Sequence, residues 1–308
     1  MKPQDGNNSH VSNTENFFGG NETGKPIKQE TDNGIQEEMT TRGDANSGNS
    51  IPTITDTTTP IVLFVGPGSS GKSMILVSLA KYFYSKNYTI APNENFYNTS
   101  QYKADCKEFN NRYNADKGKA LAGTSGFLLV DVYQGSQKKL QMLEAPGEDY
   151  IKFNSPTDPI PQYLANILAA PNKKIWVMLL DLHSEFDLAS DNGKRHIYTQ
   201  KLIDYYEGYV NRDRDAVILL YNQIDAHNPK FGTYLQISNF NGAEAFAKQM
   251  YPTIFSSFVK RPLAGLLGSF PNFKFHVYCT GFYGENKEYT ACDSVYPYKL
   301  YQEIIRRW

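Results

Sequence analysis

From Pro60 onward, short apolar runs alternate along the chain with stretches whose apolar residues recur at helical spacing. The apolar runs, each a predicted strand, are Ile61–Val65, Phe127–Val132, Leu140–Leu143, Ile175–Leu180, Ala216–Leu220 and Phe275–Tyr278. The helical patterns predict helices at Ser73–Ser85, Ile160–Ala169, Arg195–Val210, Gly242–Lys260 and Lys299–Arg306. Continuous apolar strands separated by amphipathic helices are typical of a largely parallel sheet buried on both faces. We therefore expect an α/β fold, a three-layer α/β/α sandwich around six strands.

The second and third apolar runs depart from this alternation because no helical pattern separates them. Val130–Tyr133, the segment Gln134–Gln137 and Lys139–Leu143 have the pattern of a β-hairpin, with Gly135 in its turn. The sheet should therefore be mostly parallel, with one antiparallel edge strand.

The chain changes character near residue 58. Residues 1–58 are rich in Asn, Gly, Thr, Ser and Glu, and their apolar residues are scattered singly. Such a segment buries too little apolar surface to offset its ordering entropy, so we predict a disordered tail, followed by one domain over residues 59–308. Whether the tail is a tether, a partner-binding arm or a dispensable linker stays open.

Charge and cysteine content narrow the functional classes. The 308 residues carry a formal net charge of −1, and the pI is about 6.5, so the chain lacks the basic excess that nucleic-acid binding favours. Its three cysteines include no C-x-x-C pair, which argues against a disulfide framework and a zinc site. The N-terminus has no apolar signal core, and the apolar runs are too short to span a bilayer. We expect a cytoplasmic protein without nucleic-acid partners or membrane spans.

The first predicted strand leads directly into a phosphate-binding motif. Residues Gly66-Pro67-Gly68-Ser69-Ser70-Gly71-Lys72-Ser73 match G-x-x-x-x-G-K-[ST]. Glycines let the backbone curl so that N–H groups point at phosphates, and the following helix presents its positive dipole end. Lys72 would place its charge against the β- and γ-phosphates, and the Ser73 hydroxyl would ligate Mg²⁺.

Three further segments follow predicted strands. Glu144 ends the third strand, where an acidic residue can hold Mg²⁺, and Gly147 follows it with an amide for the γ-phosphate. The fifth strand leads to Asn222-Gln223-Ile224-Asp225, where a carboxylate can accept the two N–H groups of a guanine edge. After the sixth strand, Cys279-Thr280-Gly281 offers backbone amides to the guanine carbonyl.

On these motifs, residues 60–308 resemble the Ras-like branch of P-loop GTPases (TRAFAC class), in a divergent bacterial-type form. The family's D-x-x-G, N-K-x-D and base-loop motifs match Glu144–Gly147, Asn222–Asp225 and Cys279–Gly281, and its switch-one threonine matches Thr124, 20 residues before Glu144. The resemblance implies the P-loop NTPase fold, GTP hydrolysis to GDP and phosphate, and a nucleotide-dependent switch. It implies Mg²⁺ held by Ser73, Thr124 and Glu144, and γ-phosphate chemistry involving Lys72, Thr124, Gly147 and Glu148. The implied nucleotide contacts are Gly66, Ser69, Ser70, Gly71, Lys72, Ser73, Met74, Asn222, Gln223, Asp225, Cys279 and Thr280.

Several residues depart from the family pattern. Glu144 replaces Asp, Gln223 replaces the lysine that covers the guanine, and Glu148 stands where many members carry a water-orienting Gln. An anion beside the γ-phosphate is repelled unless it is protonated or turned away. Two alternatives therefore stay open: slow intrinsic hydrolysis, or Glu148 as the base. No arginine directly precedes Thr124, so an arginine finger would come from a partner.

Two alternative functions remain. An ATP-dependent P-loop enzyme would use Asp181, which follows the fourth strand, as its acidic residue, whereas a non-hydrolysing scaffold would bind nucleotide without turnover. Residues 87–123 are rich in Tyr, Asn and Lys and replace a short switch loop. Their tyrosines either present a surface to a protein effector or pack a small helical insertion onto the core. Residues 282–297 form a second insertion.

Overall fold

The computed structural model describes residues 51–114, 126–152, 155, 157–180, 194–222, 240–258, 273–279, 282–283, 289–290 and 294–308. The chain separates into two units, Met1–Thr41 and Arg42–Trp308, and all described residues belong to the second.

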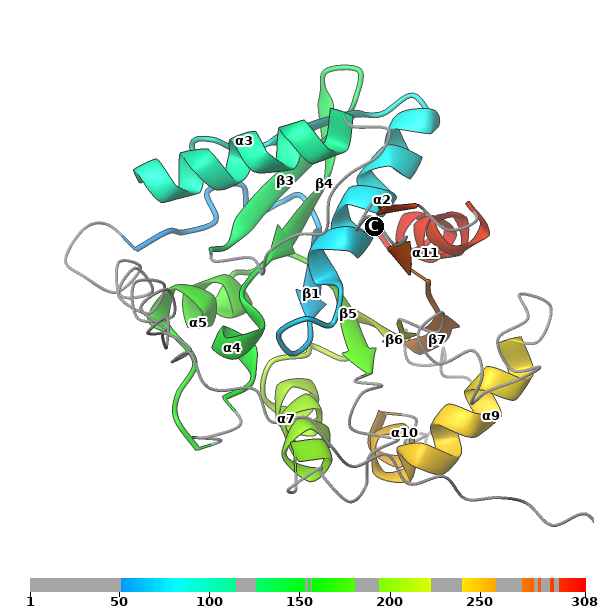
Figure 1. Cartoon of the computed structure of the whole chain (residues 1–308). Helices are drawn as coiled ribbons and strands as arrows, with labels where there is room; N and C mark the ends of the chain where they lie inside the picture. The colour runs from blue at the N-terminus through cyan, green and yellow to red at the C-terminus, as the bar shows by residue number, and fades with distance from the viewer. Residues whose placement is uncertain are drawn as a thin grey trace, which may run out of the picture. The chain divides into compact units, whose positions relative to one another are not determined.

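A seven-stranded sheet forms the centre of the described region (Figure 1). Its strands are β1 (Ile61–Val65), β2 (Thr89–Pro92), β3 (Leu128–Gln134), β4 (Gln137–Glu144), β5 (Lys174–Leu180), β6 (Ala216–Tyr221) and β7 (Phe273–Val277), and their order is β2-β3-β4-β1-β5-β6-β7. Strand β1 lies parallel to β4 and β5, and β5, β6 and β7 continue in parallel, whereas β3 is antiparallel to β2 and β4. The predicted mostly parallel α/β sheet is therefore confirmed. Strand β2 adds a seventh strand outside β3, whereas the sequence predicted six. A separate small pair joins β8 (Phe282–Tyr283) to β9 (Tyr289–Thr290).

Helices lie on both sides of this sheet (Figure 1). They are α2 (Lys72–Ser85), α3 (Ser100–Asn114), α4 (Gly147–Tyr150), α5 (Gln162–Ala169), α7 (Lys194–Gly208), α9 (Phe240–Met250), α10 (Pro252–Phe258) and α11 (Val295–Ile305). Helix α2 packs beside α3 and α11, while α10 packs beside α7 and α9. The sequence predicted one helix over Gly242–Lys260, but two helices form because Pro252 lacks the N–H that a helix interior needs and instead starts α10.

The apolar runs explain why the central strands form. Every residue of β1 is fully buried, and β5 and β6 are likewise buried along their whole length. Side chains of a strand alternate between the two faces of the sheet, so a strand that is apolar at successive positions is buried only when layers cover both faces. The carboxyl ends of these strands define the edge at which the candidate site is built.

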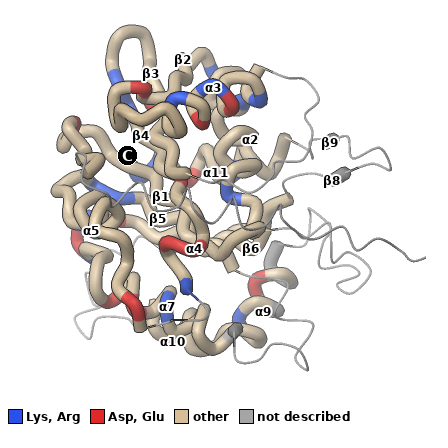
Figure 2. The backbone as a smooth tube through the Cα atoms, turned by 60° about the vertical axis from the view of Figure 1, so that its left-hand side comes forward, with Lys and Arg blue, Asp and Glu red and all other residues tan. Residues whose placement is uncertain are grey.

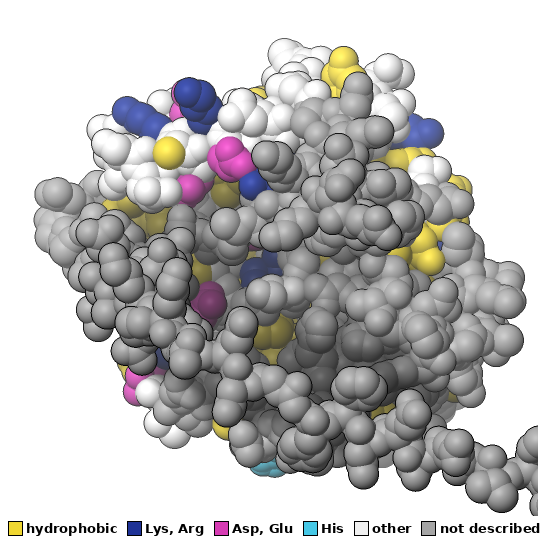
Figure 3. Space-filling view, in the orientation of Figure 1, with side chains coloured by type: hydrophobic (Ala, Val, Ile, Leu, Met, Phe, Trp, Pro, Cys, Tyr) yellow, Lys and Arg dark blue, Asp and Glu magenta, His cyan; other side chains and the backbone are white. Residues whose placement is uncertain are grey.

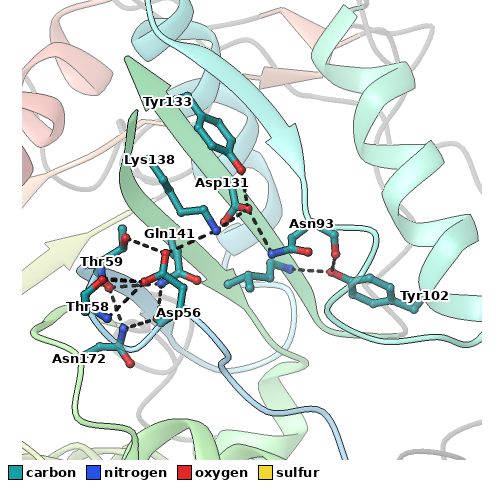
Figure 4. Close-up of polar contacts among 11 residues, drawn as sticks. Asp56, Thr58, Thr59, Asn93, Tyr102, Asp131, Tyr133, Lys138, Gln141 and Asn172 are labelled. Carbon is teal, nitrogen blue, oxygen red and sulfur yellow. Dashed lines mark hydrogen bonds and ion pairs between the residues drawn. The ribbon is translucent and has the colours of Figure 1, made fainter. Parts of the chain in front are cut away.

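The segment before β1 is attached to the amino-terminal end of the sheet (Figure 4). The Asp56 carboxylate accepts hydrogen bonds from the Thr58 and Thr59 backbone N–H groups, at 3.2 and 3.1 Å. The side chains of Gln141 and Asn172 donate to the backbone oxygens of Asp56 and Thr59, at 2.7–3.2 Å. Burial opposes ionisation of Asp56, but the hydrogen bonds from Thr59 and Thr58 outweigh it and lower its pKa to about 2.

A neighbouring cluster attaches the end of β2 to the hairpin of β3 and β4 (Figure 4). The buried carboxylate of Asp131 on β3 accepts from Asn93 just after β2, and from Tyr133, both at 3.1 Å, and pairs with Lys138 at 3.0 Å. These contacts add to the backbone pairing of the short strand β2 with β3.

Residues 87–114 pack onto the domain. The side chains of Tyr88, Tyr97 and Tyr102 are 9%, 7% and 2% exposed, whereas Tyr84 on α2 is 66% exposed. The sequence left two alternatives for these tyrosines, an effector surface or the packing of a helical insertion. Tyr88, Tyr97 and Tyr102 follow the second, and α3 is the inserted helix. Residues 115–125 lie outside the described part.

No helix within the described ranges has the length and apolar character that a bilayer crossing requires. On the face shown in Figure 3, the described Lys and Arg side chains are scattered, and some of them lie next to Asp and Glu side chains.

Candidate nucleotide-binding site

The motif Gly66–Ser73 forms the connection between β1 and α2, as the sequence predicts (Figure 1). Two of its residues adopt left-handed backbone conformations: Gly71, with φ of 87°, directly before the helix, and Ser69, with φ of 60°. Glycine adopts this conformation without a steric penalty, which explains its place before the first helical turn. Helix α2 begins at Lys72, so its unpaired N–H groups and its positive dipole end face the loop.

Lys72 lies almost entirely inside the loop. The residue is 6% exposed, and its Nζ donates to the backbone oxygens of Gly66 and Pro67, at 3.1 and 2.8 Å. Burial lowers the pKa of this ammonium, while the carboxylates of Glu144, Glu148 and Asp149 oppose the shift, in that order of effect. The loop therefore holds a buried cation whose pKa is influenced by three acidic residues.

Ser73 and Glu144 meet at the start of α2. The Ser73 hydroxyl donates to Glu144 Oε1, and the sheet register brings Glu144 opposite Phe64, near the end of β1. Glu144 is 2% exposed. A hydroxyl and a carboxylate are both oxygen ligands that suit Mg²⁺, so this pair fits the predicted metal site. Within the described ranges no group of three His, Cys, Asp or Glu residues could hold a metal ion, so phosphate and water oxygens would have to complete the coordination.

The segment after β4 lies against the phosphate loop. A Cβ atom added to Gly147 would lie 2.1 Å from the Gly68 backbone nitrogen and 2.2 Å from the Pro67 carbonyl carbon. One added to Gly68 would lie 2.8 Å from Glu148 Oε1. Gly147 and Glu148, both candidates from the sequence, thus lie next to the loop, and the close backbone approach requires glycine at position 147.

Helix α4, which carries Glu148 and Asp149, is one of the acidic segments drawn red in Figure 2. The Tyr163 hydroxyl from α5 donates to Asp149 Oδ2, and the Tyr205 hydroxyl from α7 donates to the Tyr150 backbone oxygen at 2.8 Å. Sequence analysis identified neither tyrosine, because no local motif links them to the loop. The one feature of the sequence that could have pointed to Tyr163 was its partner Asp149, an acidic residue directly after Glu148.

The predicted base-binding segments begin at the same edge of the sheet. Asn222 follows β6, is 2% exposed, and its side-chain amide donates to the Ser70 backbone oxygen at 2.8 Å. This hydrogen bond joins the end of β6 to the phosphate loop. Cys279 follows β7 and is 5% exposed, and the preceding Tyr278 is hydrogen-bonded to Ser78 of α2 at 3.0 Å.

The structure thus brings most of the predicted residues to one edge of the sheet: Gly66, Ser69, Ser70, Gly71, Lys72, Ser73, Met74, Glu144, Gly147, Glu148, Asn222 and Cys279. The remaining candidates, Thr124, Gln223, Asp225 and Thr280, lie outside the described residues, as does Asp181 of the ATPase alternative.

Comparison with known proteins finds similarity only at the level of structure. No protein-family model and no curated protein matches the chain. Among solved structures, a candidate nucleolar GTP-binding protein 1 from Plasmodium falciparum is similar, with 15% identity and a TM-score of 0.34 over 74% of this chain and 80% of that chain. The Ski7 GTPase-like domain of S. cerevisiae is also similar, at a TM-score of 0.32 and 15% identity with GDP and inorganic phosphate bound, and 0.34 and 14% with GTP bound. Each Ski7 match covers 73% of this chain but only 44% of the Ski7 chain. At such low similarity, any function must be argued from the residues of this chain.

Proposed function

We propose that this protein binds GTP and GDP with Mg²⁺ at the loop Gly66–Ser73, hydrolyses GTP to GDP and phosphate, and works as a nucleotide-dependent switch. The observation that carries the proposal is the placement of four polar groups at one sheet edge. Lys72 lies inside the loop, Ser73 contacts Glu144, and Asn222 holds the loop from β6. A buried cation next to a curled backbone and a helix N-terminus is suited to bind phosphate groups.

Each residue has a role in this proposal. Lys72 and the loop amides bind the phosphates, and Ser73 and Glu144 hold Mg²⁺ together with Thr124. Mg²⁺ would supply positive charge that offsets the charge of the phosphates. Gly147, whose backbone lies beside Pro67 and Gly68, would contact the γ-phosphate through its amide. Guanine selectivity rests on Asp225, which we assign from its motif alone.

Glu148 bears on both the binding and the hydrolysis of GTP. Its carboxylate lies beside Gly68 in the phosphate loop, where it can either accept a proton from an attacking water or repel the γ-phosphate. We propose slow hydrolysis with Glu148 as the proton acceptor, accelerated by a partner that supplies an arginine. The effector of the switch would bind through residues 87–123. This role falls to the parts of the segment other than Tyr88, Tyr97 and Tyr102, because these are buried.

The decisive test is calorimetric titration of nucleotide-stripped protein with GTP and with ATP, each with Mg²⁺. GTP should bind and ATP should bind far more weakly. Asp225→Ala should remove the preference, and Lys72→Ala should weaken both ligands. Asp213→Ala, at an exposed turn before β6, serves as the matched control and should bind as wild type does. Equal or tighter ATP binding that ignores Asp225 would overturn the guanine assignment.

The position of Glu148 beside the loop also supports a second candidate, a scaffold that binds GTP without turnover. The two differ in one measurement. Phosphate release from Mg·GTP under single-turnover conditions should depend on Glu148 and fall in Glu148→Gln if the residue accepts the proton. A scaffold would release no phosphate in either protein and would retain GTP.

A further inference from the structure

The hydrogen bond between Tyr163 and Asp149 concerns the charge at the phosphate site. Tyr163 is the second residue of α5, is 1% exposed, and donates its hydroxyl proton to Asp149 Oδ2. Burial, together with the charge of Asp149, raises the pKa of Tyr163, so the hydroxyl stays protonated and remains a donor. Asp149 is two residues after Gly147, whose backbone lies against the phosphate loop.

The ring of Tyr163 is fixed independently of its hydroxyl. It packs against the ring of Phe127, with a centroid distance of 4.7 Å and an interplanar angle of 30°. Phe127 directly precedes β3 and in turn contacts Tyr97 and Tyr102, with centroids 5.3 and 5.7 Å away. A ring held in an aromatic cluster presents its hydroxyl at a defined position, which makes the bond to Asp149 directional.

The acidic residues around Lys72 pose an electrostatic problem for a phosphate ligand. Glu144, Glu148 and Asp149 all lie close enough to influence the Lys72 ammonium. Glu144 has a role, since it contacts Ser73 at the predicted Mg²⁺ position. Two adjacent carboxylates on α4 remain, and each adds negative charge beside a triphosphate that is itself anionic. A group that binds one of them on the side away from the loop would reduce the repulsion.

We propose that Tyr163 is a positioning residue that holds the Asp149 carboxylate on the α5 side of α4, and thereby lets the loop accept a γ-phosphate. Figure 1 shows α4 between α5 and the loop that follows β1, so the bond to Tyr163 of α5 holds Asp149 on the side of α4 away from that loop. The inference rests on the proposed nucleotide binding and adds a determinant of discrimination between triphosphate and diphosphate. Its effect is on the γ-phosphate because α4 begins at Gly147, the predicted contact of that group.

The test compares affinities for GDP and for a GTP analogue with a non-hydrolysable β–γ bridge, each with Mg²⁺, in four proteins. Tyr163→Phe keeps the ring on Phe127 and removes only the hydroxyl. It should lower affinity for the GTP analogue about tenfold while GDP affinity changes less than about twofold. The double variant Tyr163→Phe/Asp149→Asn removes the carboxylate charge as well and should restore the analogue's affinity to within about twofold of wild type. Tyr206→Phe is the matched control, because Tyr206 is also buried and its hydroxyl donates to the Phe258 backbone oxygen of α10, at 3.3 Å.

These measurements distinguish a failure of the proposed nucleotide binding from a failure of the role inferred for Tyr163. If wild type binds neither nucleotide, the proposed function fails, and this inference fails with it. If wild type binds both, but Tyr163→Phe weakens both equally or Asp149→Asn restores nothing, the hydroxyl only supports packing and the positioning role is refuted. A simple loss of stability does not imitate the expected result, since it would not distinguish the two nucleotides or respond to the charge of Asp149.

Discussion

The contact between Gly147 and the phosphate loop can be tested without any ligand. Replacing Gly147 with alanine adds a Cβ atom 2.1 Å from the Gly68 backbone nitrogen, 2.2 Å from the Pro67 carbonyl carbon and 2.6 Å from the Pro67 oxygen. All three neighbours are backbone atoms, so no flexible side chain can rotate out of the way. Either α4 or the loop must move by about 1 Å before ordinary van der Waals contact is restored.

The magnitude follows from the surroundings. Pro67, a residue of the loop, is buried, and α4 is held by Tyr163 and Tyr205, so neither side of the contact is free to shift. Overpacking of well-packed regions costs about 1–3 kcal/mol. We therefore expect Gly147→Ala to lower the free energy of unfolding by about 1–3 kcal/mol, measured by urea denaturation followed by far-UV circular dichroism.

A matched glycine controls for the general effect of the substitution. Gly208 is the last residue of α7, and a Cβ atom added there meets nothing within 4 Å. Gly208→Ala should be neutral or stabilising by up to about 1 kcal/mol, because alanine favours helix. If Gly147→Ala unfolds at the same urea concentration as wild type, the close approach of α4 to the loop is wrong.

Three further outcomes are expected. Lys72→Met should weaken GTP binding about a hundredfold in calorimetry while urea denaturation shows unchanged or greater stability, since a buried charge is replaced by an apolar chain. Burial lowers the pKa of His276 from its usual 6.5 despite the opposing charge of Glu303, and the nearby cations Lys274, Lys299 and Arg307 lower it further, so the unfolded chain binds the proton more tightly. The contribution of neutral His276 to stability is therefore fully present above pH 6.5 and falls on acidification, and Glu303, whose pKa is also lowered, acts in the same direction. In urea titrations, His276→Gln should therefore lose less stability than wild type between about pH 7.5 and about pH 5. Asp56→Ala should cost about 1–2 kcal/mol in the same assay, whereas Asp158→Ala, with a side chain 52% exposed, should change little.

The central strands were predictable because each is a continuous apolar run. Ile61–Val65 was predicted with the bounds that the structure has, and Ile175–Leu180 and Ala216–Leu220 each gain one residue. Burial on both faces removes the apolar–polar alternation that marks a half-buried strand. The short length of each run then distinguishes a strand from a buried helix. The motif Gly66–Ser73 was equally predictable, since its chemistry lies in eight consecutive residues.

The insertion between α2 and β3 was predictable only in part. Helix α3 buries Tyr102, Cys106 and Phe109, which recur at helical spacing, but the polar residues between them, Lys and Asn above all, concealed the pattern. Strand β2 has four residues and ends in Pro92, which is typical of an edge strand and weak as a sequence signal. It pairs with β3 along its whole length, and the Asn93–Asp131 hydrogen bond, which joins residues 38 positions apart, adds to this pairing.

Contacts between residues far apart in the sequence also explain why the sequence left the role of Glu148 open. A motif identifies an acidic residue beside the phosphates, but the electrostatic effect of that residue depends on groups from other elements. Asp149 is chemically equivalent to Glu148 in the sequence, yet it receives a hydrogen bond from Tyr163 of α5, whereas Glu148 lies beside Gly68 in the loop. The two neighbouring acids therefore have different environments, and the charge that a phosphate meets at this edge depends on a tyrosine 14 residues further along the chain. Since Tyr163 restrains Asp149, the proposal assigns the proton of an attacking water to Glu148, which lies beside Gly68 in the loop.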